Sequence, residues 1–324
     1  VPTPIKFDKT SDLSFVLKAV SDISQVLQPG NLLIIESTCP VDISDHVIKM
    51  LQELSSQLFN DSHQPLFHLC YCPERVLPGN TVSEITLNPR AIGGYTEECA
   101  LKAKEFYSHF VEGKISMTTI KTAACSKLVE NAFRDVNIAF ANELMKFSMK
   151  AGIDYMELIS IANQHPRVNI LSPGIGVGGH CIPVDPWFLI ETDPENTSLM
   201  NTARRINDNQ PAHIIKIIKD TLFVDQAKSV RLLILGISYK ANSSDVRDSP
   251  AIKIINELNK LSKISEIQVF DPYVPSHNEL EELGIKFISK MPANLNQFSQ
   301  IIQLVDHDDF KEQSDIINSI TLSF

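Results

Sequence analysis

The sequence lacks a long apolar run, a basic excess and a cysteine framework. No apolar run approaches about eighteen residues anywhere in the 324-residue chain, which argues against a membrane span. The net charge is −10, so the basic surface of a nucleic-acid-binding protein is not expected. Six cysteines stand at irregular spacings, which is typical of a reducing compartment and predicts a cytoplasmic protein. The N-terminal segment VPTPIKFDKT has neither the basic nor the apolar region of a signal peptide.

Apolar segments rich in β-branched residues alternate with segments of helical period. The apolar segments predict buried strands at residues 31–38, 66–72, 229–239 and 266–274. Segments of helical period, such as 44–59 and 249–261, lie close to them in the chain. This alternation is typical of α/β folds and predicts parallel sheets.

The middle of the chain follows a different pattern. Residues 118–150 contain neither glycine nor proline, and their apolar residues recur at helical spacing, which predicts one long and largely buried helix. A second helical stretch is predicted at residues 198–222, with an interruption at Pro211. We therefore expect an α/β domain, a helical middle and a second α/β domain.

The segment PGIGVGGHCIPVDPWF, residues 173–188, combines a glycine-rich loop with a single cysteine. Backbone rich in glycine can approach a phosphate or a sugar closely and present N–H groups to it, although many such loops are only turns. Cys181 lies beside His180 and four residues before Asp185, a polar setting that favours a thiolate. Three other cysteines lie in apolar surroundings that fit a structural role: Cys70, Cys72 and Cys99.

The long predicted helix carries Lys127, Asn131 and Arg134 at spacings that place them on one face. A solvated face is the ordinary explanation, but the apolar residues around them predict burial, and a buried lysine needs a partner or a function. Glu74 and Arg75 follow a predicted strand whose carboxyl end is where open α/β sheets bind ligands. An ordinary exposed glutamate is the alternative at that position.

His68, Cys70 and Cys72 form an H-x-C-x-C pattern that is similar to metal ligation. Alternate residues of a strand share a face, but no second pair of ligands follows at the spacing of a zinc site. The sequence therefore predicts no metal.

Several motifs occur in the order seen in the nucleotide-sugar 6-dehydrogenases, the family that contains UDP-glucose dehydrogenase. They span nearly the whole chain and read TCP, CPERVLPG, RAIGG, KLVENAFRDVNIAFANEL, HPRVNILSPGIGVGGHCIPVDPWF and GISYKANSSDVRDSPA. Within this family the chain most resembles the branch that oxidises UDP-N-acetyl-D-mannosamine. UDP-N-acetylglucosamine and UDP-glucose are alternative substrates, and a non-catalytic UDP-sugar-binding fragment is an alternative of another class.

The resemblance implies an NAD-dependent, metal-independent oxidation of the sugar C6 alcohol to a carboxylate by two hydride transfers, in the synthesis of a bacterial surface polysaccharide. It assigns Cys181 to attack the C6 aldehyde and to form a thioester that water cleaves. Lys127 and Asn131 would stabilise the reacting oxygen, and Asp185 would share a water or proton with Lys127. Glu74 and Thr38 would lie near C6 and act on the hydrolytic water.

The resemblance also implies binding residues. Contacts to NAD are expected from Thr38, Glu74 and Arg247, and Arg247 and Lys240 would also meet the pyrophosphate of the UDP-sugar. A simple pair of Arg247 with Asp245 or Asp248 is the alternative. The implied substrate-binding residues are Arg134, Arg167, Asn169, Gly174, Gly178, Gly179, His180 and Lys240.

The resemblance divides the chain into three domains. It implies part of an NAD-binding Rossmann domain at 1–117, a central helical dimerisation and substrate domain at 118–222, and a Rossmann-like UDP-binding domain, short at its C-terminus, at 223–324. The strand, G-x-G-x-x-G turn and helix that open a Rossmann domain are missing, which suggests a fragment that lacks roughly eighty residues. We expect a homodimer whose affinity for NAD, measured by calorimetry, is severely weakened.

Overall fold

The structure is a computed structural model that describes residues 1–76, 80–222, 229–311 and 321–324. Leu77 to Gly79 of the CPERVLPG motif, and Ser319 and Ile320 near the C-terminus, lie outside these residues. The chain divides into two compact units, and we describe each unit by itself. The first comprises Val1–Phe133 and Val184–Asn201, and the second comprises Arg134–Pro183 and Thr202–Phe324.

The first unit is built on a four-stranded sheet in the order β1-β2-β3-β4. Strands β1 and β2 are parallel and confirm the strands predicted at 31–38 and 66–72. Strands β3 and β4 are also parallel to each other. The bounds are β1 (Leu32–Ile35), β2 (His68–Tyr71), β3 (Arg90–Gly94) and β4 (Ile115–Thr119).

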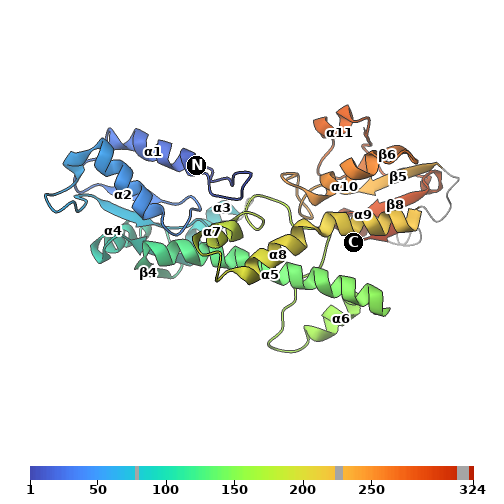
Figure 1. Ribbon diagram of the computed structural model, residues 1–324, viewed down its shortest axis with the longest axis horizontal. Helices are drawn as coiled ribbons and strands as arrows, with labels where there is room; N and C mark the ends of the chain where they lie inside the picture. Colours follow the sequence, from blue (N-terminus) through green and yellow to red (C-terminus); the bar gives the residue numbers. More distant parts are fainter. Residues whose placement is uncertain (77–79, 223–228, 312–320) are drawn as a thin grey trace. The chain divides into compact units, whose positions relative to one another are not determined.

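Helices cover both faces of this sheet (Figure 1). Helices α1 (Ser14–Ser24) and α2 (Ile43–Leu54) pack on one face, and the short helix η1 (Ser56–Leu58) follows α2. Helix α4 (Glu97–Tyr107) packs on the other face. Side chains alternate between the two faces along a strand, so the apolar residues of β1 pack against helices on both sides. Leu33 and Ile35 face α1 and α2, and Leu32 and Ile34 face α4.

The prediction of parallel sheets is wrong at one junction, because β2 and β3 are antiparallel. The connection between them contains helix α3 (Thr81–Leu87), none of whose residues is buried. A parallel connection needs a crossover element that covers a face of the sheet, and an exposed helix of seven residues does not do this. The chain therefore returns alongside β2 in the opposite direction.

The long predicted helix is confirmed as α5 (Ile120–Ala151), which has 32 residues. Its predicted burial is wrong for one aromatic series, since Phe133, Phe140 and Phe147 are 65%, 50% and 61% exposed. Within the described ranges no helix is both long and apolar enough to cross a membrane. Four shorter helices follow, namely α6 (Tyr155–Ala162), α7 (Asp185–Thr192), α8 (Ser198–Asp208) and α9 (Gln210–Leu222).

The second helical stretch is broken, as predicted, but two residues earlier than expected. Helix α8 ends at Asp208 and α9 begins at Gln210, so Pro211 is the second residue of α9. A proline in the first turn of a helix loses no hydrogen bond, which explains why α9 begins before it and not after it.

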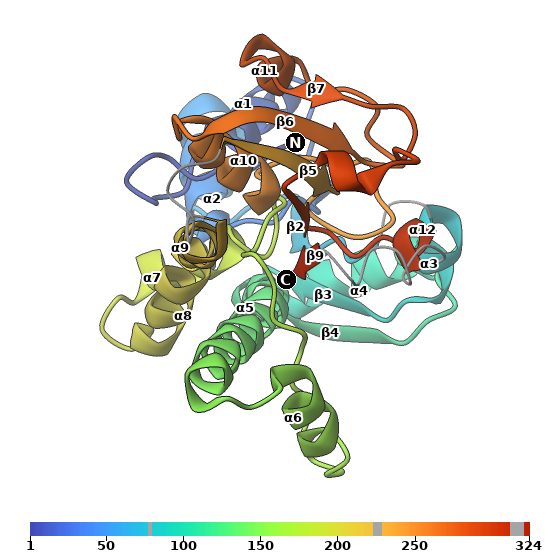
Figure 2. The ribbon, with the colours of Figure 1, turned by 90° about the vertical axis from the view of Figure 1, so that its right-hand side faces the viewer.

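The second unit contains a five-stranded parallel sheet in the order β7-β6-β5-β8-β9, part of which is seen in Figure 2. This order is typical of Rossmann-like folds, and β5 and β6 confirm the strands predicted at 229–239 and 266–274. The bounds are β5 (Val230–Leu235), β6 (Ile264–Phe270), β7 (Lys286–Phe287), β8 (Gln300–Gln303) and β9 (Thr321–Ser323).

Helices α9 and α10 (Pro250–Asn259) pack on one face of this sheet, where Leu232 and Ile234 of β5 point. Leu233 and Leu235 point to the other face and pack against the short helix η2 (Leu295–Gln297) and Phe310. The remaining helices are α11 (Asn278–Glu282) and α12 (Asp308–Lys311). The mixed α/β fold with parallel strands and a long central helix is thus the predicted fold class.

Candidate active site

The predicted site residues fall into two groups, one in each unit. The first unit holds Thr38, Glu74, Lys127, Asn131 and Asp185. The second unit holds Arg134, Arg167, Asn169, Gly174, Gly178, Gly179, His180, Cys181, Lys240 and Arg247.

In the first unit, helix α7 packs on α5 and brings two of the predicted residues into contact. Leu128 of α5 and Phe188 of α7 belong to one buried apolar cluster that joins the helices. This packing places Asp185, in the first turn of α7, against Asn131 of α5. The Nδ2 of Asn131 donates a hydrogen bond of 2.6 Å to Oδ2 of Asp185, and both side chains are buried.

Burial raises the pKa of Asp185 to about 6. The hydrogen bond from Asn131 and the positive charge of Lys127 act in the opposite direction, because each favours the carboxylate. A carboxyl group with this pKa exchanges a proton near neutral pH. The trio of Lys127, Asn131 and Asp185 can therefore bind a hydroxyl group and accept its proton.

The raised pKa of Asp185 predicts how the free energy of unfolding depends on pH. Its folded value exceeds the unfolded value of 3.8, so the stability it contributes is present below pH 3.8 and is lost as the pH rises through about 6. Asp185→Asn keeps an oxygen that can accept the hydrogen bond from Asn131 but carries no charge. We expect the variant to be more stable than the wild type by roughly 3 kcal/mol at pH 7.5.

The measurement is urea unfolding of both proteins at pH 4 and at pH 7.5. The advantage of the variant should shrink to roughly 0.5 kcal/mol at pH 4, where the carboxyl group is protonated in nearly all folded molecules and in about two fifths of the unfolded ones. An advantage that does not change with pH would show that Asp185 is not the titrating group.

The loop that carries Thr38 follows β1 and is fixed at three points. Thr3 donates through Oγ1 to the carbonyl oxygen of Thr38 at 2.5 Å. The buried Tyr71 hydroxyl accepts from the N–H of Cys39 at 3.2 Å and donates to the carbonyl oxygen of Ser37 at 3.0 Å. Sequence reasoning missed this role of Tyr71, because the tyrosine lies within an apolar strand.

Glu74 follows β2, and each of its two carboxylate oxygens is held by a partner in the first unit. Oε1 accepts hydrogen bonds from the backbone N–H groups of Arg75 and Val76 at 2.6 and 2.9 Å. Oε2 lies 3.6 Å from Nη2 of Arg90, a buried residue of β3. The Arg75 side chain pairs instead with Glu130 at 2.8 Å. Sequence reasoning missed Arg90, which is 16 residues from Glu74 in the chain.

The residues at this edge of the sheet fit the nicotinamide side of a dinucleotide. Thr38 and Glu74 follow adjacent parallel strands, so both lie at the carboxyl end of the sheet, where α/β folds bind nucleotides. A hydroxyl group and a carboxylate in these loops match the hydroxyl and carboxamide groups of a nicotinamide riboside.

In the second unit, the glycine loop packs closely on the segment that follows β5. A Cβ atom at Gly178 would lie 2.7 Å from Cβ of Tyr239, and one at Gly179 would lie 2.9 Å from its ring. Gly179 also has a φ of +82° and donates its N–H to the carbonyl oxygen of Arg247 at 3.0 Å. Larger residues are therefore excluded here, and the loop is held against the predicted UDP-binding segment.

Cys181 differs from the buried cysteines. Burial raises the pKa of Cys39 and of Cys70 to about 12, which makes these thiols poor nucleophiles at neutral pH. Cys181 is half-buried, is not part of a disulfide, and lies close enough to Arg247 for their charges to interact. Burial, followed by the positive charge of Arg247, lowers the pKa of His180, so this imidazole is neutral at neutral pH.

Arg247 forms a tight pair with Asp245, which is the alternative that the sequence left open. Its Nε lies 3.0 and 3.1 Å from the two carboxylate oxygens, and Nη2 lies 2.5 Å from one of them. The Arg247 side chain is nevertheless 58% exposed, and Lys240 is exposed as well. Helix α10 begins at Pro250, as predicted, and Ser249 caps it by accepting from the N–H of Ala251.

Three predicted substrate residues of the second unit, Arg134, Arg167 and Asn169, are exposed. In the part of the chain that the structure describes, no group of three or more His, Cys, Asp or Glu side chains is arranged to hold a metal ion.

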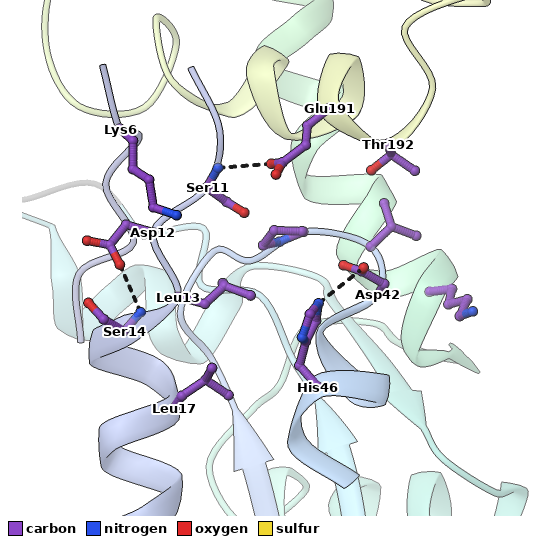
Figure 3. A pocket seen from close by; sticks show the side chains of 13 residues that line it. Lys6, Ser11, Asp12, Leu13, Ser14, Leu17, Asp42, His46, Glu191 and Thr192 are labelled. Carbon is purple, nitrogen blue, oxygen red and sulfur yellow. Dashed lines mark hydrogen bonds and ion pairs between the residues drawn. The ribbon is translucent and has the colours of Figure 1, made fainter. Parts of the chain in front are cut away.

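A cavity of about 810 Å³ in the first unit is lined by none of the predicted site residues (Figure 3). Its acidic groups have partners within the unit: Asp42 lies 3.3 Å from His46, and Glu191 accepts from the N–H of Ser11 at 2.9 Å. The cavity therefore carries no functional assignment.

Models of three domains of the UDP-glucose/GDP-mannose dehydrogenase family match the chain. The NAD binding domain matches residues 1–111, the central domain matches residues 121–209, and the UDP binding domain matches residues 233–320.

Similar proteins agree with these domain matches. The UDP-N-acetyl-D-mannosamine dehydrogenase of Salmonella typhimurium is 40% identical over 96% of this chain and 76% of its own length. The NDP-N-acetyl-D-galactosaminuronic acid dehydrogenase of Ralstonia solanacearum is 41% identical over 96% of this chain and 73% of its own length. The solved UDP-D-ManNAc dehydrogenase of Pyrococcus horikoshii is 35% identical, with a TM-score of 0.84 over 99% of this chain and 73% of that one.

Proposed function

Because this chain belongs to the UDP-glucose/GDP-mannose dehydrogenase family, we propose that it oxidises the C6 alcohol of UDP-N-acetyl-D-mannosamine to the carboxylate. The reaction is that of an NAD-dependent oxidoreductase on a UDP-sugar. The choice of sugar rests on one observation, that dehydrogenases of that name occur among both the similar curated proteins, at 40% identity over 96% of the chain, and the similar solved structures, at 35% identity and a TM-score of 0.84.

Cys181 is the proposed nucleophile. NAD⁺ supplies the acceptor for the two hydrides that leave C6, and Thr38 and Glu74 are the residues proposed to hold it. The Cys181 thiolate adds to the C6 aldehyde and forms a carbon–sulfur bond. Loss of the second hydride gives a thioester, and water then cleaves the carbon–sulfur bond to release the carboxylate, the thiolate and two protons.

Lys127 and Asn131 of α5 and Asp185 of α7 are proposed to act on the oxygen at C6. Asp185, with a pKa of about 6, accepts the proton of the alcohol at neutral pH. The ammonium group of Lys127 stabilises the negative oxygen that develops, and Asn131 holds the carboxylate of Asp185 in place. Glu74, oriented by two backbone amides and Arg90, is proposed to activate the hydrolytic water.

The UDP moiety is assigned to the segment that follows β5. Lys240 and Arg247 provide exposed positive charge, and the capped N-terminus of α10 favours an anion at the same segment. The proposed substrate-binding residues Arg134, Arg167, Asn169 and His180 are exposed and therefore accessible to a ligand. The glycines of residues 174–179 provide the close backbone approach that a sugar requires.

Initial rates of NADH formation test the proposed substrate. The purified protein is given saturating NAD⁺ with UDP-N-acetyl-D-mannosamine, UDP-N-acetylglucosamine, UDP-glucose or UDP-N-acetyl-D-galactosamine in parallel. The mannosamine derivative should show the highest kcat/KM of the four. A higher value for any of the others would assign that sugar instead.

We also propose that the protein is a cytoplasmic homodimer. None of the six cysteines is in a disulfide, which suits the cytoplasm, and recovery from the cytosolic fraction of cells tests this assignment. Phe133, Phe140 and Phe147 are exposed at seven-residue intervals along α5, so they form an apolar row of the kind that pairs helices between subunits.

Phe140→Asp is therefore expected to convert the dimer into a monomer, because it places a charge in the centre of the apolar row. Sedimentation velocity measures the change. Phe106→Asp is the matched control, since Phe106 of α4 is 51% exposed, compared with 50% for Phe140, and lies outside the row. A wild-type protein that sediments as a monomer would contradict the proposal.

A further inference from the structure

Residues 168–174 lead into the glycine loop without forming a strand or helix, yet amide side chains pair much of their backbone. We propose that Asn137, Asn142, Asn163 and Gln210 are positioning residues, which fix this segment so that it presents Asn169 to the sugar of the substrate. The inference rests on the proposed function and adds residues that the motifs of the sequence did not assign to it.

The first part of the segment is held from both edges. Asn137 of α5 donates through Nδ2 to the carbonyl oxygen of Asn169 at 2.8 Å and accepts through Oδ1 from the N–H of Leu171 at 2.9 Å. Asn163, at the end of α6, donates to the carbonyl oxygen of Ile170 at 2.9 Å and accepts from its N–H at 2.8 Å. Successive residues of an extended chain direct their N–H and C=O groups to opposite edges. Asn137 therefore binds one edge of the segment and Asn163 binds the other, and each carboxamide makes the hydrogen bonds that a neighbouring strand would make in a sheet.

The last residue of the segment is held by fully buried side chains. The N–H of Gly174 donates to Oδ1 of Asn142 at 3.0 Å, and its carbonyl oxygen accepts from Nε2 of Gln210 at 2.9 Å. Asn142 also donates to Asn207 at 2.9 Å, and Asn207 donates to the backbone and side chain of Asp135. Among the described residues, Oε1 of Gln210 and Oδ2 of Asp135 have no hydrogen-bond partner. The amide groups that hold Gly174 are nevertheless paired with its N–H and its carbonyl oxygen, and moving Gly174 would leave them buried and unpaired, so they fix its position.

The arrangement suits recognition of a polar ligand. The side chain of Asn169 is exposed although its backbone is fixed, so its carboxamide is displayed to a ligand from a rigid support. A hydroxyl-rich or acetamido sugar needs such fixed donors and acceptors. Because the backbone is ordered before the sugar binds, the entropy of ordering it does not oppose binding.

Asn137→Asp tests the inference. Aspartate keeps the acceptor for the N–H of Leu171, but it places a carboxylate oxygen where a donor faced the carbonyl oxygen of Asn169. Isothermal titration calorimetry gives the dissociation constants for UDP-N-acetyl-D-mannosamine and for UDP alone. We expect about tenfold weaker binding of the UDP-sugar, with UDP binding unchanged, because UDP is assigned to a different segment.

Two further variants complete the test. Asn163→Asp acts on the opposite edge and should show the same selective loss. Asn259→Asp is the matched control, since Asn259 of α10 also donates to a backbone carbonyl, that of Leu283, at 3.2 Å, and both affinities should be retained.

Unchanged UDP-sugar affinity in the Asn137 and Asn163 variants would overturn the inference, and so would equal losses for UDP-sugar and UDP. Failure of the proposed function has a different signature, because the wild type would then bind UDP-N-acetyl-D-mannosamine no more tightly than UDP.

Discussion

Cys181→Ala should abolish formation of the uronate, with a loss of at least about a thousandfold in the rate of the overall oxidation. Without the thiolate no covalent adduct holds the aldehyde, and no thioester forms for water to cleave. Mass spectrometry of the nucleotide-sugar products measures the effect directly. Cys181→Ser should allow oxidation at most to the level of the aldehyde, because an alcohol is a much weaker nucleophile than a thiolate at neutral pH.

The matched control for this experiment is Cys125→Ala. Cys125 is the other half-buried cysteine, and it packs beside the cluster that joins α5 and α7. It has no proposed role in the reaction, so its variant should form the uronate at close to the wild-type rate. Undiminished formation of the uronate by Cys181→Ser or Cys181→Ala would show that Cys181 is not the nucleophile.

Lys127→Ala should lower kcat by about a hundredfold to a thousandfold and change KM much less. The ammonium group is proposed to stabilise an oxygen that becomes negative only during the reaction, so its removal affects the transition state more than substrate binding. A second effect distinguishes this role from a structural one. Because the charge of Lys127 lowers the pKa of Asp185, its removal should move the acidic limb of the pH–rate profile to higher pH.

Lys121→Ala is the matched control for Lys127→Ala, because it removes another lysine from the same helix. The Lys121 side chain is 60% exposed and pairs with Asp45 at 3.2 Å, so its loss should leave kcat and the pH profile unchanged. A Lys127 variant with normal kcat and a raised KM would mean that this lysine only binds the substrate.

The fold was predictable where strands are apolar and β-branched, as in β1, β2, β5 and β6. Strand β3 was missed because it contains Gly93 and Gly94, which lower the strand propensity of the segment. The structure shows why glycine is needed there, since a Cβ atom at Gly93 would lie 2.6 Å from the carbonyl oxygen of Thr119. A close approach between segments so far apart in the chain leaves no periodic pattern in the sequence.

The burial of α5 was misjudged for a related reason. Helical spacing of apolar residues identifies a common face, but it does not say whether that face meets the core of the same chain. Ala139 and Met145 are buried, whereas Phe140 and Phe147 on the same helix are exposed. The apolar pattern alone therefore predicted a buried helix where an exposed aromatic row exists.

The candidate site was predictable only for residues that lie in motifs. The contact of Asn131 with Asp185 joins residues 54 positions apart, and the motif order placed both in the site without showing that they touch. The resemblance assigned no role to Asn142 and Arg90, although both lie within the quoted motifs, or to Gln210, which lies outside them. Their roles depend on hydrogen bonds and ion pairs to segments that only the folded chain brings together.

The central claim is a four-electron oxidation at C6 of UDP-N-acetyl-D-mannosamine, and the ratio of NADH formed to sugar consumed tests it most directly. A limiting amount of the UDP-sugar is incubated with the protein and excess NAD⁺ until the absorbance of NADH stops rising. The account predicts two NADH for each UDP-sugar, with the uronate as the product. One NADH for each sugar with an aldehyde as the product would contradict it, and so would the absence of any NADH.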